Sequence, residues 1–330
     1  MLATTIIILS GLLGWYLWER SQRRTGPVQA GLNANVTLPH RQQWTLYHNA
    51  FSLCSKKTRV CLAELGITYD SRHIDLIETG SYENISRDFL RVNPAATVPV
   101  LLHNGHPIYE SHEQIQYAAE HSPGADPLIP DDEQALAVMQ HWVHKTSLIG
   151  DDPIAGMHQT AGNAVPGLTL PLFAAMIQHI PVSRILLGLL FHRYKRRPLL
   201  FLTFKRTGLT RLNTLKPGMR ALTRSHAAMH DHLQELEAQL AESKGPWITG
   251  NQFTLADVGM MVILDRLREG QWLDSLLTDK IPNVKAYWAA LQARPSYQAG
   301  CLDHQHALVI QASHDIAQLN QTQPAFWSIS

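Results

Sequence analysis

The sequence predicts an α+β domain followed by an all-α helical domain, with one apolar helix in front of both. Three observations carry this prediction. Short strand-like runs alternate with helical stretches between residues 44 and 122. After residue 131 the apolar residues recur mainly at helical spacing. Residues 2–18 contain no charged side chain.

Composition and charge limit the class of protein. The chain has 330 residues, 45% hydrophobic and 17% charged, which excludes a disordered or collagen-like chain. This length suggests two domains. Three cysteines cannot build a disulfide framework, so we expect a reducing compartment. The net charge of +1 argues against a generally basic nucleic-acid-binding protein, and we expect no nucleic acid partner.

The N-terminal segment predicts a single-pass membrane anchor over residues 1–20. A helix of the 17 uncharged residues 2–18 would be roughly 26 Å long, close to the hydrocarbon thickness of a bilayer. The positive flank after it would place the folded domains in the cytoplasm. A cleaved signal peptide is the weaker alternative, because no basic n-region and no clear A-x-A site occur. The aromatic and basic residues that suit a membrane interface are Trp15, Tyr16, Trp18, Arg20, Arg23 and Arg24.

The α+β domain is expected over residues 44–122. Residues 21–43 before it are polar, contain Gly and Pro, show no periodicity and predict a tether. The expected order β-α-β-α-β-β-α is that of a thioredoxin-like domain. We expect strands at 44–48, 67–76, 97–102 and 107–109, helices at 55–65 and 111–120, and a polar helix-compatible stretch that ends at 91.

The all-helical domain is expected over residues 135–312, after a linker at 123–134. Thr254 and Asp257 have the spacing of a capping box at the start of one helix. The remaining residues 313–330 are polar and predict a disordered tail. Long helices are expected at 131–149 and 218–243.

Residues 150–215 have an unusual charge distribution. No Asp or Glu lies between Asp152 and Asp231, and 11 of the 28 basic residues lie there, which leaves 17 basic against 27 acidic residues elsewhere. The basic cluster at 192–197 is flanked by apolar runs. An anionic membrane lipid surface is the partner that this pattern favours. The alternative is a solvated basic face of an ordinary helical domain.

Several motifs in the expected order resemble the glutathione S-transferase family. LYHNAFSLCSKKTRVCLAELGI (46–67) aligns without a gap on the first strand and helix of the zeta and omega classes, and NPAATVPVL (93–101) and Glu110-Ser111 resemble two further family motifs. GPWITGNQFTLAD (245–257) resembles its C-terminal signature. The long insertion and the pattern LYH-x-x-x-S-x-x-S are similar to relatives of ganglioside-induced differentiation-associated protein 1. Those relatives are typically anchored at the C-terminus, whereas this anchor is N-terminal.

The resemblance implies a glutathione site. Ser52 would donate a hydrogen bond to the glutathione sulfur and favour its thiolate. The main chain of Val98, before a cis Pro99, would pair with the cysteinyl backbone of glutathione. Glu110 would take the γ-glutamyl ammonium, and Ser111 would hold its carboxylate. The alternatives are that Ser52 and Ser111 only cap helices, and that Pro99 is a trans proline on an edge strand.

Cys54 is a second candidate catalytic residue. It lies in the first turn of a predicted helix, where a cysteine can form mixed disulfides, and zeta-class members also have a cysteine there. No C-x-x-C motif results, because Lys57 takes the second position. Cys61 is expected in the core.

Eighteen histidines raise the question of a metal site. His226 and His230 are four residues apart on an expected helix, a spacing that permits metal binding. The sequence contains no H-E-x-x-H motif and no Cys-His cluster. We therefore expect no metal site and histidines that face solvent or have hydrogen-bond partners.

Three functions stay open at this stage. The first is a membrane-anchored glutathione transferase that uses glutathione as co-substrate and conjugates it to a hydrophobic electrophile held between the domains. The second is a non-catalytic membrane-bound adaptor or sensor, and the third is a glutathione-dependent thiol reductase that uses Cys54. An intact glutathione site favours the first function, and a site blocked by the insertion favours the second. The family habit also implies a homodimer, which the insertion could remodel.

Overall fold

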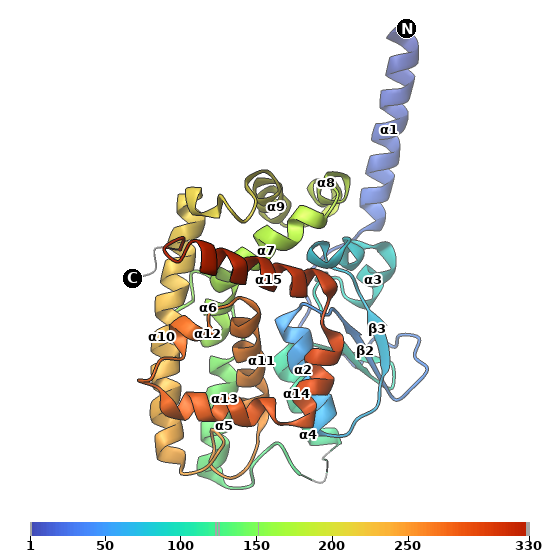
Figure 1. Cartoon of the computed structure of the whole chain (residues 1–330). Coiled ribbons are helices and arrows are strands. Elements are labelled where there is room, and N and C mark those ends of the chain that lie inside the picture. The colour runs from blue at the N-terminus through green and yellow to red at the C-terminus, as the bar shows by residue number, and fades with distance from the viewer. Residues whose placement is uncertain (1, 123, 125, 151, 328–330) are drawn as a thin grey trace.

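The structure, a computed structural model, describes residues 2–122, 124, 126–150 and 152–327. Parts of the expected anchor (Met1), linker (123 and 125), insertion (151) and tail (328–330) lie outside the described residues. A small sheet domain and a larger helical domain pack side by side, and helix α1 projects away from both (Figure 1). The thioredoxin-like domain followed by an all-helical domain is confirmed.

The first domain contains a five-stranded mixed sheet in the order β1-β5-β4-β2-β3. Leu101 and Ile108 face the main core, whereas Val100 and Leu102 face a smaller cluster with Phe89, because successive strand residues point to opposite faces. β2 pairs parallel with β3 and antiparallel with β4, and β5 is antiparallel to both β4 and β1. The strands are β1 (Gly31–Leu32), β2 (Trp44–His48), β3 (Asp70–His73), β4 (Val100–His103) and β5 (His106–Tyr109).

Helices cover both faces of this sheet. α2 (Leu53–Glu64) and α4 (Ser111–His121) pack against each other over the main-core face. α3 (Arg87–Val92) covers the other face through Phe89 and Val92. Two short 3₁₀ turns, η1 (Ile77–Thr79) and η2 (Glu83–Ile85), replace the first part of the expected polar helix before α3.

The second domain consists of helices packed around α11, which is buried along almost its whole length. The expected capping box is present: the Asp257 carboxylate accepts hydrogen bonds from the Thr254 N–H (2.8 Å) and hydroxyl (3.0 Å). Two helices, divided before Pro295, occupy residues 282–300. The helices are α5 (Glu133–Lys145), α10 (Lys216–Ser243), α11 (Leu255–Glu269), α12 (Leu273–Leu276), α13 (Pro282–Gln292), α14 (Pro295–Gly300) and α15 (Ala307–Thr322).

The C-terminal segment differs from the disordered tail that we expected. α15 continues to Thr322, and beyond it Phe326 and Trp327 are buried. The reason is an apolar stripe at helical spacing, which the many polar residues of this segment obscure. The buried residues of this stripe are Val309, Ala312, Ile316 and Leu319.

In its described residues the insertion at 150–215 contains four short α-helices and two 3₁₀ turns, and it packs onto both domains. α6 packs on α10 so closely that a Cβ at Gly167 would lie 2.0 Å from the Ser225 hydroxyl. Arg184 donates to the Gly80 carbonyl (2.6 Å), and Arg197 pairs with Glu78 of η1. The helices are α6 (Ala161–Leu168), α7 (Leu170–Met176), α8 (Val182–Phe191) and α9 (Arg196–Thr207).

The N-terminal segment forms helix α1 (Leu2–Gln22), which ends two residues after the expected anchor. Its base is docked on the body: Arg23 and Arg87 both pair with Glu19, and the Arg87 guanidinium lies 4.3 Å from the Trp18 ring. Among the described residues, no single helix is long and apolar enough to cross a membrane. Two consecutive helical segments, Ala161–His179 and Val182–Phe191, together have the length and apolar composition of a membrane span, but they meet at a bend of 115°.

The segment expected as a tether is bound to the sheet domain. The Gly26 N–H donates to the Pro94 carbonyl (2.9 Å), and the Leu38 N–H donates to the Gly105 carbonyl (2.8 Å). Between them, β1 pairs with β5 and adds a fifth strand at the sheet edge. A two-residue strand held by main-chain hydrogen bonds has no apolar alternation, so the sequence pattern could not indicate it.

Candidate functional site at the N-termini of α2 and α4

Ser52 lies where the chain leaves β2 and enters α2. The helix begins at Leu53, two residues before the expected start. Ser52 is its N-cap, because the Ser52 Oγ accepts a hydrogen bond from the Ser55 N–H (3.2 Å). The same hydroxyl lies 3.4 Å from the Val98 carbonyl oxygen, a long contact for an O–H donor. The capping role is confirmed, and the partly exposed hydroxyl keeps its proton available for a better acceptor.

The loop before Ser52 is fixed by the buried Asn49. The Asn49 Oδ1 accepts from the N–H groups of Phe51 (2.9 Å) and Ser52 (3.2 Å), and its Nδ2 donates to the Ile74 carbonyl (2.9 Å). The Arg59 guanidinium donates to the Asn49 carbonyl (3.0 Å). Because these buried hydrogen bonds define the loop, the position of Ser52 does not depend on a ligand.

The Val98–Pro99 peptide bond is cis, as the resemblance implies. Buried Gln114 of α4 joins this turn to its surroundings. Its Nε2 donates to the carbonyls of Pro99 (3.0 Å) and Ile108 (2.9 Å), while its Oε1 accepts from the Thr58 hydroxyl on α2 (2.9 Å). A single amide therefore ties α2, α4 and the residue after Val98 together.

Glu110 and Ser111 form the turn into α4. The structure corrects one alternative: the N-cap is Glu110, and Ser111 is the first helical residue, so Ser111 does not occupy the N-cap position that the capping alternative requires. Glu110 is exposed and has a φ of 67°, an uncommon conformation for a residue other than glycine. The first N–H groups of a helix lack intrahelical partners, which suits a carboxylate at this position.

Lys57, one turn after Cys54 on α2, is a residue that sequence reasoning missed. It is fully buried, and its ammonium donates to the Thr146 carbonyl (3.2 Å). Burial lowers the pKa of Lys57, whereas the nearby Cys54 and Glu110 raise it. The i, i+3 spacing from Cys54 could have indicated that both residues point to the same side of the helix. Cys54 is partly exposed, and Cys61 is buried in the core as expected.

Lys56 connects the site helix to the second domain. Its buried ammonium lies 2.5 Å from a carboxylate oxygen of both Asp265 and Glu269 on α11. Burial by itself would raise the pKa of Asp265, but Lys56 and Arg268 hold it below its ordinary value. This buried cluster of opposite charges locks α2 onto α11.

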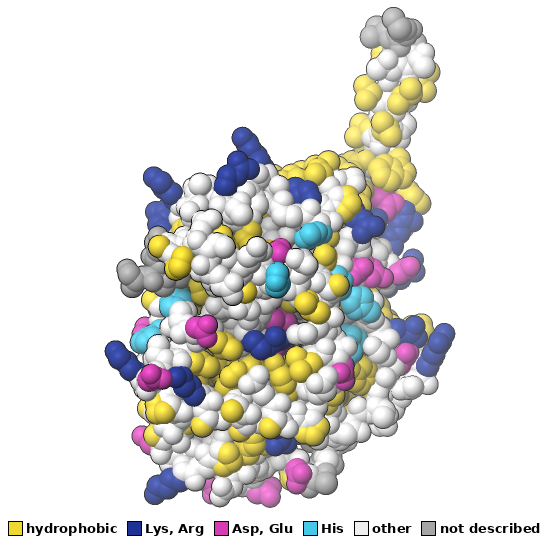
Figure 2. Space-filling model, in the orientation of Figure 1, with side chains coloured by type: hydrophobic (Ala, Val, Ile, Leu, Met, Phe, Trp, Pro, Cys, Tyr) yellow, Lys and Arg dark blue, Asp and Glu magenta, His cyan; other side chains and the backbone are white. Residues whose placement is uncertain are grey.

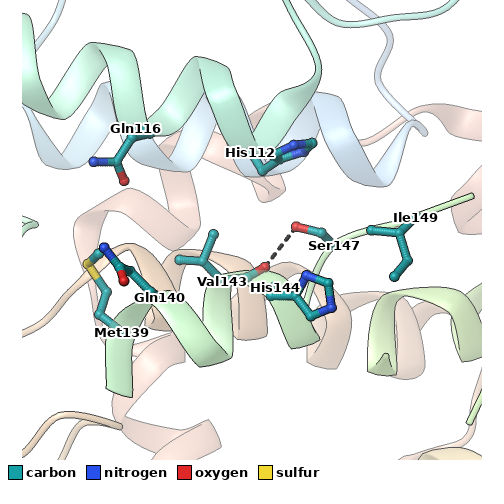
Figure 3. Close-up of a pocket in the computed structure, with 8 residues that line it drawn as sticks. All are labelled: His112, Gln116, Met139, Gln140, Val143, His144, Ser147 and Ile149. Atoms are coloured by element: carbon teal, nitrogen blue, oxygen red, sulfur yellow. Dashed lines mark hydrogen bonds between the residues drawn. The ribbon is translucent and has the colours of Figure 1, made fainter. Parts of the chain in front are cut away.

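An apolar cleft of about 160 Å³ lies between α4 and α5, where the two domains meet (Figure 3). His112, directly after Ser111, lines it from the α4 side, opposite His144 and Ser147. Burial and the nearby Lys57 lower the pKa of His112, which favours the neutral imidazole. The lining residues are His112, Gln116, Met139, Gln140, Val143, His144, Ser147 and Ile149.

The insertion covers one flank of the Ser52 loop. The Phe51 ring lies between the Arg266 guanidinium (3.7 Å) and the edge of Phe173 on α7 (5.7 Å between ring centroids). Phe51 is thereby buried, while the neighbouring Ser52 and Cys54 stay partly exposed. The insertion shields the loop from one side without covering the two candidate catalytic side chains.

Known proteins resemble this chain over both domains. Residues 51–121 match the glutathione S-transferase N-terminal domain, and residues 220–299 match the C-terminal domain. The glutathione S-transferase TCHQD of Arabidopsis thaliana is 29% identical over 77% of this chain and 87% of its own length. The tetrachloro-p-hydroquinone reductive dehalogenase of Sphingobium chlorophenolicum is 23% identical over 77% of this chain and 94% of its own.

Solved structures agree with the fold. The β-etherase LigF of Sphingobium sp. strain SYK-6 superposes with a TM-score of 0.62 at 18% identity, over 79% of this chain and all of the other. A glutathione S-transferase-I bound with lactoylglutathione gives a TM-score of 0.53 at 20% identity, over 79% of this chain and 99% of its own. Glutathione is the co-substrate of the family to which these relatives belong. The order of the two matched domains, the relatives and the fold together show that this chain is a member of the glutathione S-transferase family.

Proposed function

We propose that this chain is a membrane-anchored glutathione transferase that conjugates glutathione to a hydrophobic electrophile. The observation that carries the proposal is the grouping of Ser52, the Val98 main chain and the Glu110-Ser111 turn at the N-termini of α2 and α4. These groups offer a hydroxyl donor, the main chain of a partly exposed residue and a carboxylate beside a helix N-terminus. Glutathione carries one complementary group for each of them.

The chemistry of conjugation requires a thiolate at neutral pH. The Ser52 hydroxyl would turn from the long Val98 contact to the glutathione sulfur, and the N-terminus of α2 would further favour negative charge there. The thiol proton leaves to solvent. The sulfur lone pair then forms a C–S bond as the leaving group departs with its electron pair, or the added pair is protonated by water when nothing leaves.

The anchor is supported by the exposure of α1. Large apolar side chains are exposed around the whole helix, which at 21 residues is roughly 32 Å long. A bilayer would remove this surface from water, and the arginines at its base would stay on the cytoplasmic side. Apolar electrophiles partition into lipid, so such an anchor holds the site beside its substrate pool. The exposed residues are Ile6, Ile7, Ile8, Leu9, Leu12, Leu13, Trp15, Leu17 and Trp18.

Thiol–disulfide exchange through Cys54 is the second candidate function. Two observations favour it: Cys54 is partly exposed in the first turn of α2, and relatives of this chain are named as a reductive dehalogenase and a reductive dechlorinase. The Cys54 thiolate would attack the glutathione sulfur of a mixed disulfide and release the substrate thiol. A second glutathione would then resolve the Cys54–glutathione disulfide and leave as oxidised glutathione.

A matched pair of variants separates these functions. Ser52→Ala and Cys54→Ser each change one heteroatom in the same turn of α2. The full chain in lipid nanodiscs is titrated with glutathione by calorimetry and assayed against alkyl and aryl halides and against glutathionylated thiols. Conjugation that falls in Ser52→Ala but persists in Cys54→Ser supports the transferase, and the reverse supports exchange. Failure to bind millimolar glutathione would refute both and leave the non-catalytic adaptor.

A further inference from the structure

The outer side of α8 and α9 is an apolar surface that no other described element covers. Leu186, Leu187 and Leu190 of α8 and Leu199 and Leu200 of α9 are each 40–53% exposed. Their opposite sides are fixed in the protein: Ile185 and Phe204 are among the buried residues. α8 is therefore apolar on both sides along most of its length, which is unusual for a surface helix of a water-soluble domain, and Leu199 and Leu200 extend this surface onto α9.

Exposed basic side chains lie at the ends of the two helices that form this surface. Arg193, Lys195 and Arg196 lie in and after the turn between the two helices, and Arg206 and Arg211 follow at the end of α9. All five are exposed, and none has an acidic partner among the described residues. In Figure 2, basic side chains project above an apolar area next to the base of α1. Exposed leucines with a rim of Lys and Arg match the boundary between acyl chains and anionic headgroups.

The position of α8 relative to α1 shows which end of the body this surface occupies. Phe191, at the end of α8, contacts the rings of Trp15 (6.3 Å between centroids) and Tyr16 (5.9 Å), and the Arg23 guanidinium lies 4.5 Å from the Phe191 ring. α8 and α9 lie at the end of the body from which α1 leaves (Figure 1). Trp and Tyr side chains of membrane helices concentrate at the headgroup level. The end of α8 is thus at the level where α1 would meet the headgroups.

We propose that α8 and α9 form a second membrane contact, a helical hairpin that lies in the headgroup boundary of an anionic bilayer beside α1. The proposal rests on the anchor proposed above and adds the lipid class and the orientation of the body. α1 holds the chain in the bilayer, and the hairpin fixes which side of the body faces it. Arg184 and Arg197 of the same hairpin contact Gly80 and Glu78, so the membrane-facing surface is joined directly to the glutathione-binding domain.

Hydrogen exchange of the full chain in nanodiscs tests this contact. Nanodiscs of phosphatidylcholine alone are compared with nanodiscs in which about one third of the lipid is phosphatidylglycerol. We expect amides of α8 and α9 to exchange about tenfold more slowly in the anionic nanodiscs, and the difference to shrink as salt is raised. Equal exchange in both lipids would overturn the proposal.

A charge-reversal pair makes the test specific. Arg193→Glu/Arg196→Glu changes two exposed side chains of the rim and should abolish the lipid-dependent protection. Lys244→Glu/Lys280→Glu changes the net charge equally, at exposed positions outside the insertion, and should leave it intact. Equal effects of both pairs would overturn the proposal. Protection that appears without lipid when the protein is concentrated would also overturn it, because that result assigns the surface to a second copy.

Carbonate extraction checks the anchor separately. A chain that is extracted from the membrane refutes the anchor. A chain that is retained but shows no protection in anionic nanodiscs refutes only the hairpin.

Discussion

Ser52→Ala separates the two roles of one hydroxyl. Loss of the N-cap hydrogen bond to the Ser55 N–H should cost about 1 kcal/mol of stability. Loss of a hydrogen bond to a thiolate should cost about 2 kcal/mol, because one partner is charged. This second loss acts on the bound thiolate alone and corresponds to a rise of about 1.5 units in the pKa of the glutathione thiol.

The expected rate effect is smaller than the pKa effect. Below the thiol pKa the thiolate fraction falls about thirtyfold, but a more basic thiolate is more nucleophilic, with a Brønsted slope of about 0.4–0.5. The net loss of kcat/KM at low pH is then roughly sixfold, whereas above the new pKa, where both thiols are ionised, the more basic thiolate of the variant should react about fivefold faster. The assay is the pH profile of kcat/KM together with the ultraviolet titration of bound glutathione thiolate.

Ser86→Ala is the matched control for this experiment. Ser86 caps α3 in the same way, accepting from the Phe89 N–H at 3.2 Å, and lies on a helix that carries no candidate glutathione contact. Both variants should lose similar stability, but only Ser52→Ala should move the thiol pKa. If the pKa of bound glutathione is the same in all three proteins, Ser52 only caps α2 and the reasoning is refuted.

Three further outcomes follow from the structure. Glu110→Gln removes the charge offered to the glutathione ammonium, so the Kd for glutathione should rise about tenfold by calorimetry. Lys56→Met leaves the carboxylates of Asp265 and Glu269 buried without their cation, so urea unfolding should show about 3–5 kcal/mol less stability. Burial lowers the pKa of His48 to about 2. Because His48 of the unfolded chain takes up a proton below about pH 6.5 and His48 of the folded chain does not, the free energy of unfolding should fall with pH by up to about 1.4 kcal/mol per pH unit. His48→Gln should reduce that slope.

Each of these outcomes has a control on the same chain. Glu113→Gln, on the same helix as Glu110, should leave the glutathione Kd unchanged. Lys145→Met removes a surface ion pair with Glu235 and should cost no more than about 1 kcal/mol. A cost for Lys56→Met that is no larger than this would contradict the buried-pair argument. An acid slope that is unchanged in His48→Gln would show that other groups dominate acid unfolding.

The thioredoxin-like domain could be predicted well because its elements are short and its motifs local. Ser52, the cis Pro99 and the Glu110 turn each lie within a few residues of the element that positions them. Contacts between distant segments left no such local pattern. Lys56 and Lys57 read as ordinary solvated lysines of a helix, and only the packing of α11 and the end of α5 against α2 buries them.

For the insertion, too, the composition could be predicted from the sequence but the contacts could not. Its charge and apolar content were evident in the sequence, but its contacts with the first domain were not. The Gly80 carbonyl accepts from Arg184 across more than 100 residues of chain, and Phe173 reaches Phe51 over a similar separation. A sequence pattern reports which residue types recur, and it carries no information about which surface a given helix will meet.

The segment of residues 24–38, bound along the sheet edge, fixes the distance between α1 and the candidate glutathione site. Main-chain hydrogen bonds at Gly26, β1 and Leu38 hold this segment on the domain, so it does not behave as a flexible linker. If α1 holds the chain in a bilayer, Ser52 then stays at a fixed distance from the lipid and in a fixed orientation to it. Such an enzyme meets its substrate by lateral diffusion in two dimensions, and lengthening the segment would extend its reach only after β1 had detached from β5.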